Sequence, residues 1–195
     1  MRTILPHTHN PLLRDIAREV PISEITSSTI RTLIADMKHL LAREQYGVAI
    51  AAPQIGESLR IFVVSGKALS KRSDNDEDEN TLEKDIEGSS ALASVSSTRS
   101  ITEIDQVYIN PVMLKVSRGK VLKHEGCLSV KGKWGHVARA EKATIRAYDE
   151  HGALFTRGAA GFLAHVFQHE MDHLDGILYI DKAKDLQDDK PEDDE

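Results

Sequence analysis

The segment His169-Glu170-Met171-Asp172-His173 constrains the fold of this chain more than any other feature. Apolar residues such as Phe162 and Val166 precede it at helical spacing and predict a helix over residues 159–174. On a helix, histidines four residues apart lie one turn apart on the same face, so both imidazoles can bind one metal ion. The glutamate beside the first histidine can then take a proton from a water at the metal. A surface helix with two unrelated histidines is the alternative.

A hydrolytic metal site of this kind needs a third protein ligand and one open position. The only cysteine of the chain, Cys127, follows Glu125 and Gly126 and precedes Leu128 and Ser129. A thiolate beside the predicted helix would complete a Cys/His/His ligand set, and the glycine would let the backbone approach the ion closely. A lone buried cysteine is more often an inert core residue, so the residue alone leaves both roles open.

A further histidine, His165, is four residues before His169 and is expected on the same helix face. It is two turns from His173, about 12 Å at a rise of about 1.5 Å per residue, so one ion cannot easily bind both. A pair of His165 and His169 is geometrically allowed, but it would leave the rest of the motif without a role. We therefore expect His165 in the wall of the site.

A run of small apolar residues over 48–52 follows Gly47 and ends at Pro53, which bars a continuing helix. This pattern predicts a short strand or an extended loop that passes through the interior. Gln54 follows directly and offers a side-chain amide donor. Acyl chemistry needs such a donor where negative charge develops on a carbonyl oxygen. A tightly packed strand with a solvent-facing glutamine is the alternative.

The other elements follow from apolar periodicity and from runs of β-branched residues. Helical spacing predicts a first helix over residues 24–45, with Thr26 or Ser27 as the N-cap. A helix in front, strands in the middle and a helix behind indicate an α+β fold in a single domain over residues 1–182. The predicted strands cover residues 60–65, 106–110, 112–117 and 143–148.

The net charge of −6 belongs to two segments. Residues 71–87 and residues 181–195 each carry eight acidic and three basic residues, so the remainder of the chain is mildly basic. Blocks of like charge are typical of solvated chain, and we predict a surface insertion over 67–103 and an acidic tail over 183–195. Two interpretations of the insertion are open. It is a lid or docking segment, or it is a tolerated insertion without a function.

Several classes of protein are excluded by composition. No apolar run has the length of a membrane helix, and one cysteine cannot form an internal disulfide. No basic stripe interleaved with aromatic residues supports nucleic-acid binding. We expect a cytoplasmic protein, because no secretory or transit pattern is present at the N-terminus.

Residues 47–54, 125–129 and 168–173 resemble, in this order, three motifs of the peptide deformylase family. The family carries a Gly-x-Gly-x-Ala-Ala-x-Gln-like motif, a Glu-Gly-Cys-Leu-Ser motif and a Gln-His-Glu-x-Asp-His motif. Residues 11–14 and 109–111 add to the resemblance. It implies antiparallel sheets packed around a central metal-binding helix. It also implies an enzyme that removes the N-formyl group from the N-terminal methionine of newly synthesised polypeptides.

The resemblance further implies a site with one divalent metal ion held by Cys127, His169 and His173. Fe2+ is the ion expected in cells, and Zn2+, Ni2+ or Co2+ could replace it. N-formylmethionyl peptides are the implied partners, and the ribosome surface is a further candidate.

By the same resemblance, Glu170 would transfer protons in the reaction. The Gln54 amide and the Leu128 backbone N–H would stabilise the oxyanion that forms from the formyl group. The residues expected to contact the substrate are Gly47, Val48, Ala49, Glu125, Gly126, Phe162, His165 and Val166.

Three positions depart from the family pattern. Ala49 stands at the second glycine of the first motif, Trp134 stands where some members supply an arginine to the substrate, and His165 stands at a place that is usually apolar. These departures leave open a deformylase-fold hydrolase of another short formyl or acyl peptide. They concern the substrate more than the metal ligands.

Two further alternatives belong to other classes. A catalytically silent metal-binding protein could use its insertion to dock a partner, but it would need neither Glu170 nor Gln54. A plain zinc metalloprotease would not explain Cys127. A last pair, Glu125 and Arg139, is either a buried pair that braces the cysteine segment or an ordinary surface pair.

Overall fold

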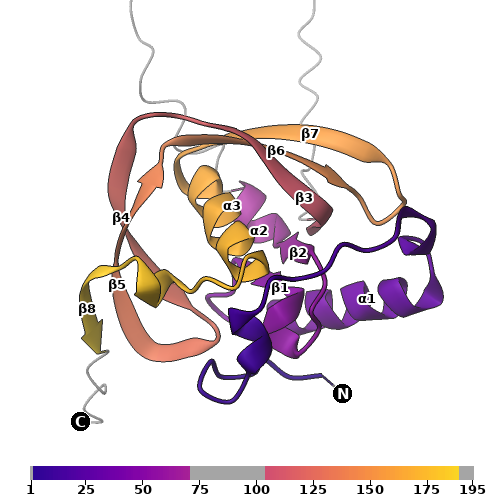
Figure 1. Ribbon diagram of the computed structural model, residues 1–195, viewed down its shortest axis with the longest axis horizontal. Helices are drawn as coiled ribbons and strands as arrows, with labels where there is room; N and C mark the ends of the chain where they lie inside the picture. The colour runs from indigo at the N-terminus through magenta and orange to yellow at the C-terminus, as the bar shows by residue number, and fades with distance from the viewer. Residues whose placement is uncertain (1, 71–103, 189–195) are drawn as a thin grey trace, which may run out of the picture.

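The computed structural model describes residues 2–70 and 104–188 of the chain (Figure 1). Most of the predicted insertion and the end of the predicted tail lie outside these described residues. No described helix is long and apolar enough to span a membrane.

The helices are α1 (Ser28–Arg43), α2 (Gly66–Ser70) and α3 (Gly161–Leu174), with 3-10 turns η1 (Pro11–Arg14), η2 (Ile22–Glu24), η3 (Ala52–Ile55) and η4 (Tyr179–Asp181). The strands are β1 (Ala49–Ala51), β2 (Ile61–Val64), β3 (Gln106–Val116), β4 (Lys120–Cys127), β5 (Val130–Ala140), β6 (Lys142–Tyr148), β7 (Leu154–Ala160) and β8 (Lys184–Asp188).

Two antiparallel sheets enclose helix α3, as Figure 1 shows. The first sheet has the strand order β1-β2-β3-β6-β7, and the second has the order β4-β5-β8. Helix α3 packs against β1, β6 and β7 of the first sheet and against β5 of the second. This arrangement confirms the predicted α+β class, with antiparallel sheets around a central helix.

The strands β1 and β2 are buried on both faces, which explains their almost continuous apolar sequence. Phe62 and Val64 face α3, where Phe62 stacks on Tyr108 with ring centroids 4.5 Å apart. Ile61 and Val63 face the opposite way and pack with the apolar stripe of α1. The two faces of β2 therefore belong to two separate hydrophobic clusters, and β1 lies between the same clusters, with Ala49 and Ala51 in one and Ile50 in the other.

Helix α1 is shorter than the predicted range of 24–45. The Ser27 side chain caps it by accepting a hydrogen bond from the backbone N–H of Ile30, and residues 22–24 form a separate 3-10 turn. Helix α3 starts at Gly161, close to the predicted start at residue 159. It buries Val166, but Phe162 is 52% exposed, so the prediction from apolar spacing is wrong at that position.

The two strands predicted over 106–110 and 112–117 are one strand, β3, and the predicted break between them is wrong. Pro111 cannot donate to the ladder, and the register shifts between Ile109 and Val112. Asn110 lies there with a positive φ of 49°. Its side chain pairs with the Val20 backbone, accepting at 2.8 Å and donating at 2.7 Å. These hydrogen bonds hold the strand at the register shift, and β3 continues beyond it.

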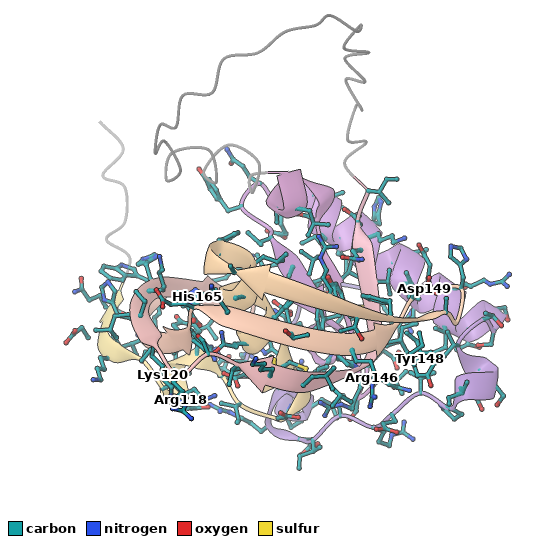
Figure 2. All side chains as sticks on the ribbon, turned by 90° about the horizontal axis from the view of Figure 1, so that it is seen from above. Arg118, Lys120, Arg146, Tyr148, Asp149 and His165 are labelled. Atoms are coloured by element: carbon teal, nitrogen blue, oxygen red, sulfur yellow. The ribbon has the colours of Figure 1, made fainter. Side chains whose placement is uncertain are left out.

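The structure also contains elements that the sequence patterns did not predict. Helix α2 occupies residues within the start of the predicted insertion, where Ala68 is buried. Strand β8 lies within the predicted acidic tail and pairs with β5. Strands β4, β5 and β7 were not predicted. Figure 2 shows Lys120, the first residue of β4, on the same side of the molecule as His165.

Candidate active site

Three of the predicted site residues meet where β4 ends against α3. The ligand atoms of Cys127, His169 and His173 all lie within 4.8 Å of one another. The Cys127 Sγ is 3.3 Å from the His173 Nε2, and the two imidazole rings have centroids 4.9 Å apart. One thiolate and two imidazoles at this separation suit a divalent metal ion with tetrahedral coordination and one open position. The geometry therefore fits a metal site.

The cysteine reaches the helix because β4 is irregular just before it. The register of β4 and β5 shifts between Glu125 and Cys127, with Gly126 between them. Such a shift turns a side chain away from the alternating pattern of a strand. The N-terminal segment supports the following turn, since the backbone N–H of His7 donates to the Ser129 carbonyl at 2.8 Å.

The orientation of His169 is set by Glu125, whose Oε2 lies 2.9 Å from the Nδ1 atom of the ring. This contact leaves the Nε2 atom for a metal ion, as is usual for metal-binding histidines. Glu125 also pairs with Arg139 through two hydrogen bonds of 2.7 and 2.9 Å. Arg139 and Glu125 are 4% and 7% exposed, so the buried pair is confirmed and the surface pair is not.

The same arginine also contacts a residue near the C-terminal end of α3. Its Nη1 lies 2.5 Å from Asp172, and Lys182 lies 2.6 Å from the second oxygen of Asp172. Burial alone would raise the pKa of Glu125, but its hydrogen bonds with Arg139 and His169 lower it to about 2. Glu125 is therefore a stable anion behind the histidine. The residues Glu125, Arg139, Asp172 and Lys182, with His169, are called the Arg139 network below.

The charge of the ligand residues also favours a cation. Burial opposes ionisation of Cys127, but the imidazoles of His173 and His169 hold the pKa of its thiol well below the ordinary value. Burial likewise opposes protonation of His169, yet the thiolate and Glu125 raise its pKa well above the ordinary value. A metal ion would supply the positive charge that a proton on His169 supplies otherwise.

Glu170 lies between the two histidines in sequence and is 3% exposed. Its Oε2 atom is enclosed and has no hydrogen-bond partner among the described residues, and the same holds for the His173 Nδ1. Burial raises the pKa of Glu170 above its ordinary value. An enclosed carboxylate oxygen without a partner is available to exchange a proton with a ligand.

Gln54 is 2% exposed, so the alternative of a solvent-facing glutamine is wrong. Its Oε1 atom accepts a hydrogen bond of 2.8 Å from the Ala51 backbone N–H, which fixes the orientation of the amide. Its Nε2 atom is directed at Cys127 Sγ and Ser129 Oγ, at 3.5 and 3.4 Å. These contacts are long, so the amide N–H groups remain able to donate to a ligand.

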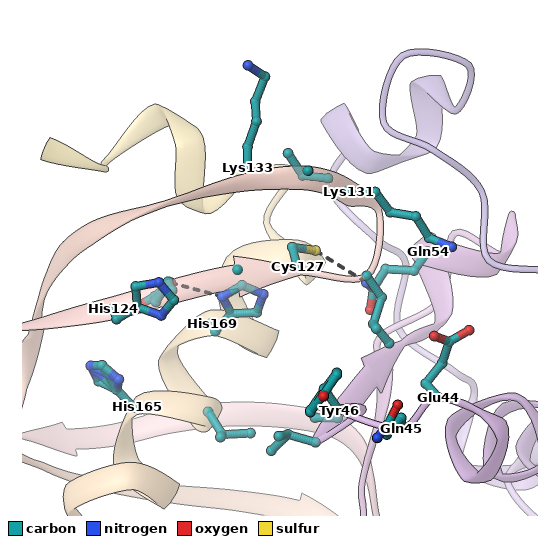
Figure 3. Close-up of a pocket in the computed structure, with 18 of the residues that line it drawn as sticks. Glu44, Gln45, Tyr46, Gln54, His124, Cys127, Lys131, Lys133, His165 and His169 are labelled. Atoms are coloured by element: carbon teal, nitrogen blue, oxygen red, sulfur yellow. Dashed lines mark hydrogen bonds and ion pairs between the residues drawn. The ribbon is translucent and has the colours of Figure 1, made fainter. Parts of the chain in front are cut away.

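A cavity of about 800 Å³ opens beside these groups (Figure 3). Gly47, Glu170 and His173 are not among its lining residues. A Cβ atom at Gly47 would come within 2.8 Å of the Glu44 Cβ, so this glycine allows close packing after α1. The predicted site residues that line the cavity are Val48, Ala49, Gln54, Glu125, Gly126, Cys127, Leu128, Phe162, His165, Val166 and His169.

Other residues at the cavity were not singled out from the sequence. Tyr46, His124, Lys131 and Lys133 are part of its wall. The spacing of these residues carries no signal of a site, because they come from the turn after α1 and from two strands that pair only in the fold. Trp134 is not in this wall; its ring lies tilted against that of His124, with centroids 4.6 Å apart.

Asp172 was also missed as a member of the site. It lies inside the histidine motif, so its position could have drawn attention to it. Its partners Arg139 and Lys182, however, lie 33 and 10 residues away in sequence. Only the fold brings the three together.

Comparison with known proteins agrees with this geometry. The family model described as polypeptide deformylase matches residues 1–189. The peptide deformylase of Halothermothrix orenii is 37% identical over 174 residues, which cover 89% of this chain and 88% of that protein.

Solved structures agree as well. A peptide deformylase from Legionella pneumophila has 32% identity and a TM-score of 0.68, with 95% of this chain and 87% of that chain covered. The deformylase from Synechococcus elongatus, solved in complex with actinonin, has 26% identity and a TM-score of 0.67, with 93% and 78% covered. The chain belongs to the peptide deformylase family.

Proposed function

We propose that this protein is a peptide deformylase that hydrolyses the N-formyl group from the N-terminal methionine of newly synthesised polypeptides. The observation that carries the proposal is the meeting of a Cys/His/His cluster, a buried glutamate and an oriented glutamine amide at one site. A silent metal-binding protein would need neither of the last two groups. A metalloprotease would not need the thiolate.

Cys127, His169 and His173 would hold the metal ion. A mixed sulfur and nitrogen donor set accepts several first-row divalent ions. We infer Fe2+ as the ion used in the cell, with Zn2+, Ni2+ or Co2+ as replacements. When bound, the ion would polarise the formyl carbonyl group and make a water molecule more acidic.

Glu170 would accept the proton of the attacking water and then deliver it to the amine of the departing peptide. Its enclosed Oε2 atom has no other hydrogen-bond partner among the described residues, so the proton has a defined acceptor. Exclusion of bulk water around this carboxylate keeps the transferred proton at the site.

Gln54 and Leu128 would stabilise the negative charge that develops on the formyl oxygen. The Ala51 N–H holds the Gln54 amide so that its N–H groups face the metal ligands before substrate arrives. A donor that is oriented in advance needs no reorganisation during the reaction. Leu128 directly follows the cysteine and lines the same cavity.

The substrate would bind along β1 and place its first side chain against α3. Strand β1 lies at the edge of the five-stranded sheet, so its free side can pair with an extended peptide. Val48, Phe162, His165 and Val166 line the cavity beside it and are the proposed wall around the methionine side chain. Glu125, Gly126 and Ala49 complete that wall.

The proposed partners are N-formylmethionyl peptides, and we place the protein in the cytoplasm. Because these peptides are newly made chains, the ribosome surface is a further proposed partner. The division into a catalytic domain over 1–182 and an acidic tail over 183–195 also remains a prediction, with β8 inside the latter range.

The test is hydrolysis of formyl-Met-Ala-Ser by protein purified without oxygen, beside Glu170→Ala and the matched control Glu24→Ala. Glu24 is exposed and does not line the cavity. We expect turnover in the wild type and the control, none in Glu170→Ala, and equal metal content in all three. Bound metal without turnover in the wild type would refute the proposal.

A further inference from the structure

Several polar residues in the wall of the main cavity take no part in the reaction, and His165 is the one with an enclosed atom that has no partner among the described residues. His165 projects from α3 and lines two cavities, the main one and a smaller one of about 280 Å³. Figure 3 shows it on the opposite side of the main cavity from Glu44 and Gln54. Its neighbours in the main wall include Val48, Phe162 and Val166, which are apolar. The wall around the imidazole is therefore mixed, since these apolar residues line the cavity together with His124, Glu125 and His169.

His165 is buried, with 8% of its surface exposed. Its Nε2 atom is enclosed and has no hydrogen-bond partner among the described residues. Enclosing a polar atom without a partner destabilises a protein, so such atoms are rare and are usually completed by a water or a ligand. The residue also lines the main cavity, so a ligand bound there would be the group that completes it.

The charges around the ring favour an acceptor as that ligand. Burial lowers the pKa of His165 to about 4, and the positive charges of Arg139 and Lys123 act in the same direction. Glu125 opposes this shift without reversing it. The ring is neutral at pH 7 and carries one N–H donor. The smaller cavity behind it is lined by three basic residues, Lys123, Arg139 and Lys142, and by one acidic residue, Glu141. The excess of basic side chains favours a ligand atom with partial negative charge.

We propose that His165 selects substrates whose first side chain has the length of methionine and ends in a hydrogen-bond acceptor. The thioether sulfur of methionine is a weak acceptor, and the oxygen of methionine sulfoxide is a strong one. Norleucine has the same length and no acceptor. The inference rests on the proposed deformylase function and names a substrate class for it, N-formyl peptides that begin with methionine or methionine sulfoxide.

The first experiment compares formyl-X-Ala-Ser peptides in which X is methionine, methionine sulfoxide or norleucine. In the wild type we expect a higher kcat/KM for the sulfoxide than for norleucine. In His165→Leu we expect the ratio of these two values to fall at least about tenfold, because an unpaired polar group in an apolar wall is unfavourable. Metal content is measured in each sample and should not change.

Two matched variants separate hydrogen bonding from the shape of the cavity. His165→Gln keeps a side-chain N–H donor and should retain most of the preference for the sulfoxide. Phe162→Leu changes the size of the wall and should alter all three rates without changing the ratio. If His165→Leu does not fold, a wild-type preference for norleucine over the sulfoxide is sufficient to overturn the inference.

A binding measurement tests the preference for the sulfoxide over norleucine without turnover. Calorimetry measures the dissociation constants of Met(O)-Ala-Ser and Nle-Ala-Ser for the wild type and for His165→Leu. The ratio of the two constants should change in the variant in the same way as the ratio of the kcat/KM values. If formyl-Met-Ala-Ser is hydrolysed but the ratios are equal in the two proteins, His165 has no such role and the deformylase function stands. If no formyl peptide is hydrolysed, the deformylase proposal fails, and equal binding of the two peptides overturns the inference separately.

Discussion

Two groups of residues around the metal-ligand cluster differ in how their buried polar groups are paired. In the Arg139 network, each charged side chain has an oppositely charged partner within 2.9 Å. At three other positions of α3, by contrast, His165 Nε2, Glu170 Oε2 and His173 Nδ1 are enclosed and have no partner among the described residues. Both regions contain titratable residues of similar burial, so burial alone does not distinguish them.

The difference separates positioning residues from residues that meet ligands. A buried charge with partners on several sides is held in one orientation, and here the orientation reaches His169 through Glu125. An enclosed polar atom without a partner destabilises the folded protein, so a metal ion, a water or a substrate is expected to complete it. Substitutions in the Arg139 network should therefore lower the stability of the protein, whereas substitutions of the unpaired groups should lower its activity.

The largest effect is expected from Glu170→Gln. This change keeps the size of the side chain and removes its ability to accept a proton. We expect kcat/KM for formyl-Met-Ala-Ser to fall about 10³-fold, with unchanged metal content and thermal stability. Activity within tenfold of the wild type would show that this unpaired carboxylate is not the proton acceptor.

The main effect of Arg139→Met should be a loss of stability. It leaves Glu125 and Asp172 buried without the cation between them, so the free energy of unfolding should fall by about 3–5 kcal/mol. Urea unfolding measures this loss. The control Arg146→Met removes an exposed arginine from the neighbouring strand β6 and should change stability by less than about 0.5 kcal/mol. Equal losses in the two variants would remove the distinction between the network and an ordinary surface.

Gln54→Leu sharpens the comparison, because Gln54 has features of both regions. Its Oε1 is firmly paired with Ala51, whereas its Nε2 makes only the long contacts to Cys127 and Ser129. If the amide stabilises developing charge, kcat should fall about 10²-fold while metal content stays unchanged. The control Gln187→Leu alters an exposed residue of β8 and should leave kcat unchanged. A loss confined to KM would instead indicate a role in substrate binding alone.

The two histidine ligands on α3 were easier to predict from sequence than the charged residues that support them. The spacing of His169 and His173 expresses the geometry of one helix turn, so a local pattern predicted that they share a face. Helix α1 was predictable for the same reason, from its apolar stripe. The position of Cys127 depended on the resemblance to a family, since a lone cysteine has no local signature.

The rest depended on contacts between distant segments. Strand β4 is exposed at most positions, so it lacks the alternation of buried and exposed residues that predicts a strand. Strand β8 is exposed throughout and lies in an acidic segment, and its pairing with β5 forms only in the fold. The break predicted within β3 was wrong because the pairing of Asn110 with Val20, 90 residues away, is not visible in the sequence.

The smallest effect is expected at the outer end of the network, in Lys182→Met. The Lys182 side chain is 40% exposed, and solvent screens its contact with Asp172, which keeps Arg139 as a partner. We expect a loss of less than about 1 kcal/mol in the free energy of unfolding and no change in kcat/KM. In the Arg139→Met background, however, Lys182 is the remaining cation beside Asp172, so the same change should cost more there than in the wild type. A double-mutant cycle measured by urea unfolding tests this, and strictly additive losses would show that the network ends at Arg139 and that Lys182 is only a surface contact.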